Sequence, residues 1–322
     1  MTDGSPTGKG KRNCPPAAFD SRLPALFRSL TASFAAMGLA FALPACARAA
    51  PPAKDADPAL WVVKDQDTTI YLFGTIHVLK PGLTWFDEAV KKAFDGSNTL
   101  VLEMVEPDRA TQQKVVLAKA FAPDGPPLSA QIPAGKRAVM AKTLTDNGFA
   151  LSQYDRMRPW FAAITLSILP LEKLGYDPAN GPEGILTRAA RAQNKQVMGL
   201  ETFEGQMSIF DKLSQKGQIE LLTSTIDELP KAAETMDKMV DEWAGGHPEE
   251  LAKDMNASLK DTPEVAETLL LNRNRQWAGW IAERMKTPGT VFIAVGAGHL
   301  AGTGSVQEQL LRYKLKATRV KY

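Results

Sequence analysis

Two of the three histidines in this chain occur in the same short pattern, at opposite ends of the sequence. Gly74-Thr-Ile-His77 follows the apolar run 70–73, and Gly296-Ala-Gly-His299 follows the apolar run 291–295. Each run is typical of a buried strand, and glycine lets a chain turn sharply on leaving a sheet because it tolerates positive φ. In open α/β sheets, ligands and catalytic groups gather at the carboxyl ends of the strands. The matched pair therefore predicts one shared site, although a single histidine at such a place is commonly a helix cap or a core residue.

Two glutamates end further apolar runs. Glu103 follows Leu-Val-Leu and Glu201 follows Met-Gly-Leu. A buried carboxylate is costly unless it is paired or coordinates an ion, and imidazole with carboxylate suits a divalent metal such as Zn²⁺ or Mn²⁺. We predict His77, His299 and Glu103 as ligands, with a helix cap or a salt bridge as the alternative for either glutamate. Consecutive strands are usually neighbours, so Glu103 is expected beside the first histidine motif and Glu201 in a supporting role.

A basic and an amide side chain complete the predicted catalytic set of Glu103, Glu201, Arg273 and Asn274. Arg273 and Asn274 lie in Leu-Leu-Asn-Arg-Asn-Arg-Gln, which is typical of a helix. A buried arginine could hold Glu201 or a substrate oxyanion through paired hydrogen bonds, whereas a solvated helix face is the plain alternative. The third histidine, His247, stands in Gly-Gly-His-Pro and is predicted to be an exposed loop residue.

The elements that must position these side chains alternate between strand and helix. A hairpin is predicted over 61–73, further strands over 98–104, 196–201 and 290–295, and an edge strand over 317–322. Segments 123–133 and 175–184 are predicted loops. Helical spacing occurs at 83–94, 108–120, 134–147, 151–169 and 185–193, and almost without interruption at 203–285. The pattern predicts an α/β domain with a helical insertion, about 203–285, between the third and fourth core strands.

The charge of the chain is unevenly distributed. The 322 residues are 44% apolar and carry a formal charge of +2. Residues 1–49 hold six basic groups (Lys9, Lys11, Arg12, Arg22, Arg28, Arg48) and two acidic ones (Asp3, Asp20). The remainder is nearly neutral, which offers no electrostatic footprint for nucleic acid. We therefore expect no nucleic-acid partner.

The N-terminus has the features of an export signal. The uncharged stretch 29–47 follows two arginines and ends in small residues that match the A-x-A cleavage pattern at 45–47 and 47–49. We predict a disordered segment plus signal peptide or membrane anchor over 1–49, a linker over 50–58 and one domain over 59–322. Leu43-Pro-Ala-Cys46 also resembles a lipobox, so a lipoprotein anchored at Cys46 is the alternative. The protein is expected in the periplasm or cell envelope, and its only cysteines are Cys14 and Cys46.

Taken together, the motifs resemble those of the TraB/GumN family, which is related to the TIKI metalloproteases and, more distantly, to ChaN haem-binding proteins and erythromycin esterases. The matching pieces run from about residue 58 to 322. They are Leu60-Trp, Tyr71-Leu-Phe-Gly-Thr-Ile-His77, Leu102-Glu103, Gly199-Leu-Glu-Thr202 with Gln206, Arg273-Asn274, and Val295-Gly-Ala-Gly-His-Leu300 with Gly302. Where the family often has Gly-Ile/Val-Asp, this chain has Gly181-Pro-Glu183, which puts a role for that Asp in doubt.

The resemblance implies a mixed central sheet flanked by helices and a metal-dependent hydrolase site built on the two G-x-x-H motifs. The expected function is an exported hydrolase, of the peptidase kind, that uses a divalent ion (Mn²⁺, Zn²⁺ or Co²⁺) on a peptide or protein substrate. The alternative is a non-catalytic envelope protein that binds haem or a peptide. Histidine suits both functions, so the residues do not separate them.

Overall fold

A mixed six-stranded sheet forms the centre of the protein in this computed structural model, which describes residues 53–259 and 262–322. The strand order is β6-β5-β7-β3-β2-β8. The members of the sheet are β2 (Leu60–Lys64), β3 (Thr68–Thr75), β5 (Thr99–Met104), β6 (Gln196–Glu201), β7 (Gly289–Gly296) and β8 (Thr318–Arg319). Four adjacent strands, β6, β5, β7 and β3, run parallel, whereas β2 pairs antiparallel with both β3 and β8. The α/β class and the mixed sheet predicted from the sequence are confirmed.

The two central strands carry the histidine motifs, and their sequences explain their place. Both β3 and β7 are apolar along most of their length and are buried on both faces, as parallel strands covered by helices are. One prediction about strand order is wrong. Glu103 was expected beside the first histidine motif because β5 follows β3 in the chain, but β7 enters the sheet between them. The long helical segment before β7 lets a late strand take the central place.

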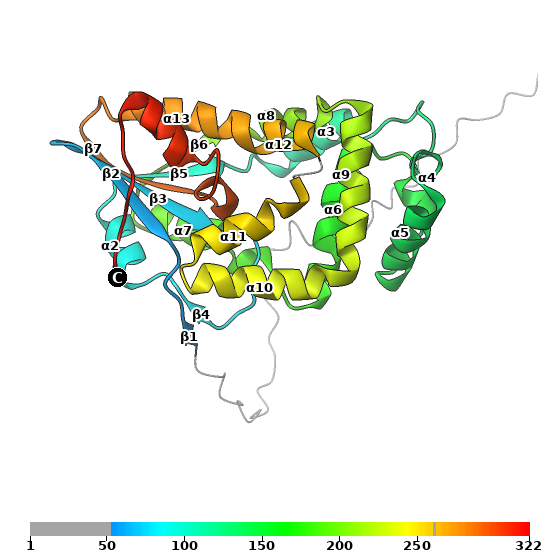
Figure 1. Cartoon of the computed structure of the whole chain (residues 1–322), viewed down its shortest axis with the longest axis horizontal. Coiled ribbons are helices and arrows are strands. Elements are labelled where there is room, and N and C mark those ends of the chain that lie inside the picture. The colour runs from blue at the N-terminus through cyan, green and yellow to red at the C-terminus, as the bar shows by residue number, and fades with distance from the viewer. Residues whose placement is uncertain (1–52, 260–261) are drawn as a thin grey trace, which may run out of the picture. The chain divides into compact units, whose positions relative to one another are not determined.

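Helices cover both faces of the sheet (Figure 1). On one face, α2 (Glu88–Asp95) and α7 (Pro182–Ala192) pack on Phe73, Leu102 and Phe292. On the other, α13 (Asn272–Arg284) and α14 (Val306–Leu310) cover Ile70 and Ile293. The result is a sheet between two helical layers, with apolar cores on both sides.

The remaining helices lie beyond the carboxyl ends of the parallel strands, toward which the arrow of β3 points (Figure 1). Between β5 and β6 the chain forms α3 (Arg109–Lys119), α4 (Leu128–Gln131), α5 (Ala134–Asp146), α6 (Pro159–Lys173) and then α7. Between β6 and β7 it forms α8 (Phe203–Asp211), α9 (Gln215–Glu228), α10 (Ala232–Ala244), α11 (Pro248–Met255), α12 (Pro263–Ala266) and α13. The predicted helical insertion between the third and fourth core strands is therefore present.

Several predicted boundaries differ from the structure. The predicted helix 83–94 begins only at Glu88, because Leu83–Thr84 forms β4, which pairs in parallel with β1 (Lys54–Asp55). The predicted loop 123–133 contains the short helix α4. The predicted loop 175–184 ends early, since Pro182 begins α7 at a position where its missing N–H costs nothing. The predictions for residues 1–49 lie outside the described residues.

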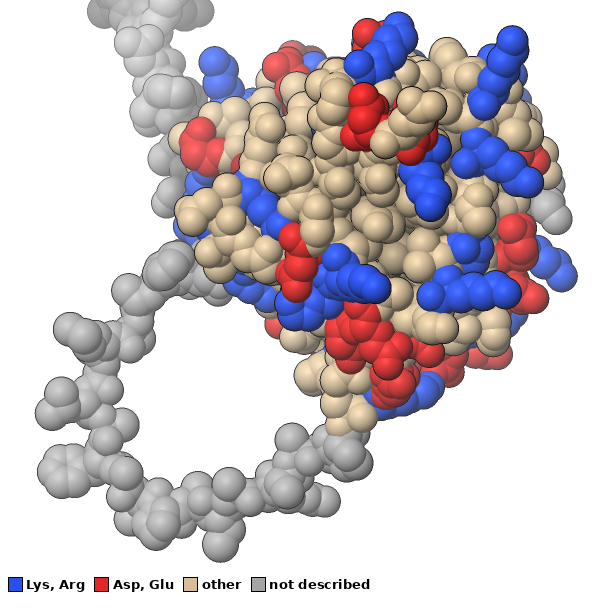
Figure 2. Space-filling view, turned by 90° about the vertical axis from the view of Figure 1, so that its left-hand side faces the viewer, with Lys and Arg blue, Asp and Glu red and all other residues tan. Residues whose placement is uncertain are grey.

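Charged side chains of both signs are interspersed on the molecular face of Figure 2, which looks at the left-hand side of Figure 1. None of the helices within 53–259 and 262–322 is long and apolar enough to span a membrane.

Candidate functional site

The two G-x-x-H motifs leave the sheet side by side. β3 and β7 are paired in parallel, with Gly74 opposite Val295 and Thr75 opposite Gly296, so both histidines follow the same carboxyl edge. Neither glycine has the positive φ that the sequence suggested. Both are needed instead because a side chain at either position would meet a close neighbour. A Cβ on Gly74 would lie 3.1 Å from Cα of Ala297 in the other motif. A Cβ on Gly296 would lie 3.0 Å from Oε1 of Glu103. Each glycine thus admits a close neighbour that helps to build the site.

A single guanidinium joins the two predicted glutamates. Arg273 donates from Nε to Glu201 Oε1 at 2.8 Å, and from Nη2 to Glu201 Oε2 at 3.0 Å and to Glu103 Oε2 at 2.5 Å. Its Nη1 lies 3.2 Å from both the Leu269 carbonyl and His299 Nε2. Arginine has five N–H donors, and protein atoms accept all five. Arg273 therefore holds the two carboxylates and has no free donor for a substrate oxyanion.

The helix that carries Arg273 is irregular just before it. A π-helical turn, Glu267–Leu271, separates α12 from α13. Such turns loosen the backbone ladder and occur frequently at functional sites. The Leu269 carbonyl in this turn accepts from the Arg273 guanidinium, so the turn contributes directly to the orientation of the side chain.

Glu201 is fully occupied as an acceptor. Its Oε1 also accepts from Trp277 Nε1 at 3.0 Å, and its Oε2 also accepts from Gln206 Nε2 at 3.0 Å. A carboxylate offers about four lone-pair positions, and with the two bonds from Arg273 all of them are filled. Such a group can hold neighbours in place but has no lone pair left for a substrate, a water molecule or an ion.

Glu103 differs because one of its positions is open. Oε2 accepts from Arg273 and, at 3.3 Å, from Gln206. Within the part of the chain that the structure describes, Oε1 accepts only from the Gly296 amide, at 2.7 Å. Burial has the largest single effect on Glu103 and would raise its pKa, but the positive charge of Arg273, the two histidines and the hydrogen bond from the Gly296 amide together outweigh it and lower the pKa to about 2. Glu103 is therefore an anion with one free lone pair on Oε1.

His299 belongs to the same cluster and is buried, with 8% of its surface exposed. Its Nδ1 lies 2.6 Å from Asn274 Oδ1, and Asn274 donates from Nδ2 to the Gly304 carbonyl at 2.8 Å. The Gly304 bond fixes the orientation of the amide, so Nδ1 of His299 carries the hydrogen and Nε2 accepts from Arg273. Burial lowers the pKa of His299 to about 4. The ring is neutral at pH 7, and both of its nitrogens are occupied.

His77 lies apart from this cluster, in a pair with Glu183. Its Nδ1 lies 2.7 Å from Glu183 Oε1, which also accepts from Thr75 Oγ1 at 2.6 Å. The Glu183 carboxylate raises the pKa of His77 to about 9. Solvent screens part of this attraction, because 69% of the His77 side chain is exposed. Within the described residues no hydrogen bond joins His77 to the arginine cluster, although its charge helps to lower the pKa of Glu103.

Glu183 is the site residue that the sequence analysis missed. It lies in the first turn of α7, directly after Gly181 and Pro182. The signal in the sequence was Glu183 itself, the third residue of Gly-Pro-Glu. It stands where the family often has the Asp of Gly-Ile/Val-Asp, and its side chain carries the same carboxyl group on one more methylene. Gly181 is needed for close approach, since a Cβ there would lie 2.3 Å from the His77 carbonyl oxygen.

The donor types suit a divalent ion, but the observed bonds do not fit the predicted three-ligand set of His77, His299 and Glu103. The guanidinium of Arg273 already uses His299 Nε2 and one oxygen of Glu103. Among residues 53–259 and 262–322, no group of three His, Cys, Asp or Glu side chains is placed to hold one ion. The atoms left open are His77 Nε2 and one lone pair of Glu103.

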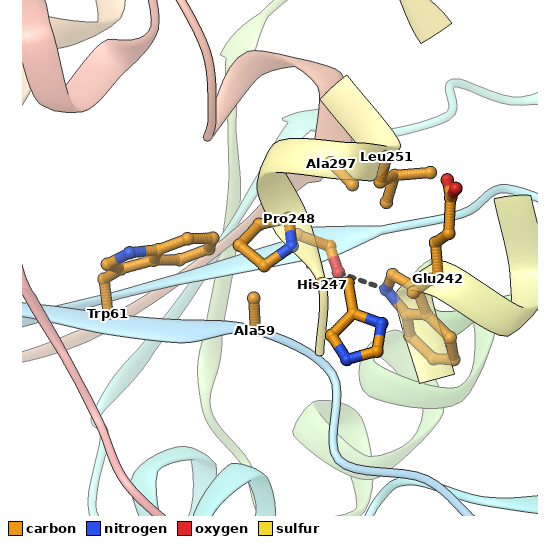
Figure 3. A pocket seen from close by; sticks show the side chains of 9 residues that line it. Ala59, Trp61, Glu242, His247, Pro248, Leu251 and Ala297 are labelled. Carbon is orange, nitrogen blue, oxygen red and sulfur yellow. Dashed lines mark hydrogen bonds between the residues drawn. The ribbon is translucent and has the colours of Figure 1, made fainter. Parts of the chain in front are cut away.

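A small hollow lies behind the two motifs, between the sheet and helices α10 and α11 (Figure 3). Gly74 and Ala297 of the two motifs line it, together with residues that include Trp61, Pro248 and Leu251. Trp243 of α10 also lines the hollow and donates from Nε1 to the Gly74 carbonyl at 2.7 Å, the bond dashed in Figure 3. His247 also lines the hollow, remains exposed as predicted and precedes α11.

Comparison with known proteins agrees with the motifs. Residues 59–319 match the model of the TraB/PrgY/gumN family. The chain is 24% identical to "Uncharacterized protein YbaP" of Escherichia coli (strain K12) over 253 residues, which cover 79% of this chain and 92% of the relative. YbaP of Shigella flexneri is similar to the same extent. An "Uncharacterized protein" of Treponema pallidum (strain Nichols) is 21% identical over 273 residues, covering 79% of this chain and 80% of the relative. No solved structure matches significantly.

Proposed function

This chain belongs to the TraB/PrgY/gumN family, and from that membership and the site we propose that it is a hydrolase with peptide bonds as its substrate class. One observation carries the proposal. At the carboxyl edge of β3, β5 and β7, two groups able to handle protons keep open positions, His77 Nε2 and Glu103 Oε1, while their neighbours are held rigidly. Acid–base hydrolysis requires catalytic groups in fixed positions, and here neighbours whose own hydrogen bonds are all made hold them in place.

The two open atoms suit complementary tasks. Glu103 is an anion at neutral pH, so its Oε1 can accept a hydrogen bond from an attacking water molecule. His77 is a cation below its pKa of about 9, so its Nε2 can donate a proton to the leaving group. Arg273 keeps Glu103 ionised and in place. Dependence on a divalent metal stays a prediction from the family resemblance, and no step here requires it.

The test is peptide cleavage by the purified protein, read by mass spectrometry of a mixed peptide library. We expect cleavage by the wild type and loss of cleavage in His77→Gln. The matched control is His247→Gln, because His247 is the third histidine and is an exposed residue at the start of α11, not part of either G-x-x-H motif. Cleavage that survives His77→Gln would reject the proposal.

The same preparation tests the predicted metal and the second function. Metal content and the effect of a chelator on cleavage show whether an ion takes part. An absence of cleavage together with a Soret band after haem addition would favour the ligand-binding alternative, for which His77 is an exposed candidate.

We also propose that the protein is exported to the periplasm or cell envelope, with a mature chain that begins between Cys46 and Ala50. The support is the apolar stretch 29–47, which ends in small residues. Intact mass of the protein from an envelope fraction tests this, and an added lipid mass on Cys46 would identify a lipoprotein. A full-length cytosolic product would contradict it.

A further inference from the structure

We propose that the two G-x-x-H histidines have different tasks: His77, positioned by Glu183, meets the substrate, whereas His299 serves inside the protein as the acceptor that orients Arg273. The inference rests on the proposed function for its catalytic part. Its structural part concerns hydrogen bonds alone and stands independently of any activity.

The first step is the occupancy of His299. Both ring nitrogens have protein partners, Asn274 at Nδ1 and Arg273 at Nε2. The ring also packs on Trp277, with centroids 4.5 Å apart, and is almost wholly buried. A substrate or an ion could reach Nε2 only by displacing a guanidinium that two carboxylates hold in place.

The second step is the contrast with His77. Among the described residues only Nδ1 has a hydrogen-bond partner, and that partner, Glu183, is anchored by Thr75 and by the start of α7. A histidine whose Nδ1 is held by a carboxylate presents Nε2 in a fixed direction, as in catalytic and metal-ligating imidazoles. The ring is mostly exposed, so an external molecule can reach Nε2.

The third step links the two histidines through one carboxylate. His299 and the Leu269 carbonyl fix the Nη1 end of Arg273, and the Nη2 end then holds Glu103 Oε2. The other oxygen of Glu103 faces the Gly296 amide with one lone pair free. His299 therefore acts on the site through Arg273 and is a positioning residue, as is Glu183 through His77.

The structural part is tested without any substrate, by ¹⁵N NMR of the histidine rings in the wild-type protein. We expect His299 as the neutral tautomer with hydrogen on Nδ1, the rarer form for histidine. During a Zn²⁺ titration, we expect the coordination shift at Nε2 of His77 and none at His299, with His247 as the internal reference. An Nε2–H tautomer of His299, or a coordination shift at both motif histidines, would overturn the inference whether or not the protein cleaves peptides.

The catalytic part is tested by two kinds of rescue. His77→Ala should lower kcat by about 100-fold or more and recover part of it with added imidazole, because the position is open to solvent. His299→Ala should show no such recovery. Glu183→Gln should lower kcat by about 10- to 100-fold with little change in KM, and Glu183→Asp should restore much of the loss. Recovery of His299→Ala by imidazole, or equal kcat in Glu183→Gln and the wild type, would refute the assignment.

Discussion

Arg273 donates every one of its guanidinium hydrogens to the protein. These bonds decide which of the residues around it keep an open hydrogen-bonding position. Glu201 has all of its acceptor positions filled, while Glu103 keeps one open. The sequence suggested different roles for the two glutamates from strand adjacency, a reason that the strand order contradicts. The hydrogen bonds supply a better reason for the same difference.

The first prediction concerns these two glutamates. Glu201→Gln leaves a buried guanidinium partly unpaired and places an amide N–H₂ against a donor, so the free energy of unfolding should fall by about 3–5 kcal/mol. Activity should fall only in proportion to the loss of folded protein. Urea unfolding, with kcat measured well below the melting temperature, provides both values.

The matched variant is Glu103→Gln. It should abolish activity beyond any loss of stability, because the amide cannot replace the carboxylate at the open Oε1 position. Full activity in Glu103→Gln, or an inactive Glu201→Gln with an unchanged melting temperature, would show that the two roles are reversed or shared.

The second prediction concerns acid stability through His299. Its folded pKa is about 4, below the ordinary value of 6.5, so between these values the unfolded chain binds a proton that the folded protein does not. The free energy of unfolding should therefore fall as pH drops from 6.5 to 4, by roughly 3 kcal/mol from this group alone. Urea midpoints at several pH values, compared between wild type and His299→Gln, measure this slope.

The contribution of His77 to the pH dependence of stability has the opposite sign. Its folded pKa is raised to about 9, so its contribution is present below pH 6.5 and is lost as pH rises through 9. Solvent screening at this exposed ring keeps the contribution below about 1 kcal/mol.

The prediction for His299 has its own contradicting outcome. If His299→Gln loses stability between pH 6.5 and 4 as steeply as the wild type, the buried His299 ring is not the cause.

Among the elements, the contact between the end of β3 and the start of α7 places Glu183 against His77. Gly181 precedes α7 and lets the helix start touch the backbone of His77. This is a contact between segments separated by about a hundred residues, and neither segment shows it in its own sequence.

The third prediction tests this contact. A Cβ at Gly181 would meet the His77 carbonyl, so Gly181→Ala should destabilise the protein by about 1–3 kcal/mol through overpacking and should weaken the His77–Glu183 pair. Gly135→Ala is the control, because Gly135 in α5 has open space around it and should be neutral or stabilising by up to about 1 kcal/mol. Thermal unfolding and the His77 ring signals measure the two effects, and equal behaviour of the two variants would contradict the close approach.

For the molecule as a whole, the helices beyond the strand ends are tied to the sheet at the first histidine motif. Trp243 on α10 donates to the Gly74 carbonyl and packs edge-to-face against Phe73 and Trp85. Nearby, Asp237 of α10 accepts from Lys80 and from Tyr176. These bonds hold α10 against the loops that follow β3 and precede α7, so the histidine motif and the helical segment should lose structure together.

The fourth prediction follows from this tie. Trp243→Phe removes the hydrogen bond to the buried Gly74 carbonyl and should lower the free energy of unfolding by about 1–3 kcal/mol. Trp280→Phe is the control, because the Trp280 indole nitrogen makes no hydrogen bond within the described residues. Urea unfolding gives both values, and a smaller loss in Trp243→Phe than in Trp280→Phe would mean that the bond does not stabilise the fold.

Much of this architecture can be predicted from local patterns in the sequence. Burial periodicity and turn chemistry act over a few residues, so they can be recognised in the sequence. They predict the apolar runs of β3, β5, β6 and β7, the hairpin of β2 and β3, the edge strand β8 and the helical segment before β7. The two motif histidines and both glutamates could likewise be identified from the sequence, because a polar side chain at the end of a buried apolar run is costly unless it has a partner. Arg273 and Asn274 were identified as the groups on a predicted helix that could pair with them.

Other features depend on distance in the chain. Three such features are the entry of β7 between β3 and β5, the contact of Arg273 with both glutamates, and the contact of Glu183 with His77. They join residues that are about 70 to 220 positions apart. No local propensity encodes them, because they arise when separate elements bury their apolar faces against one sheet. The residue types at the strand ends are therefore a property of the sequence, while their pairing, and with it the open or occupied state of each histidine, is a consequence of packing.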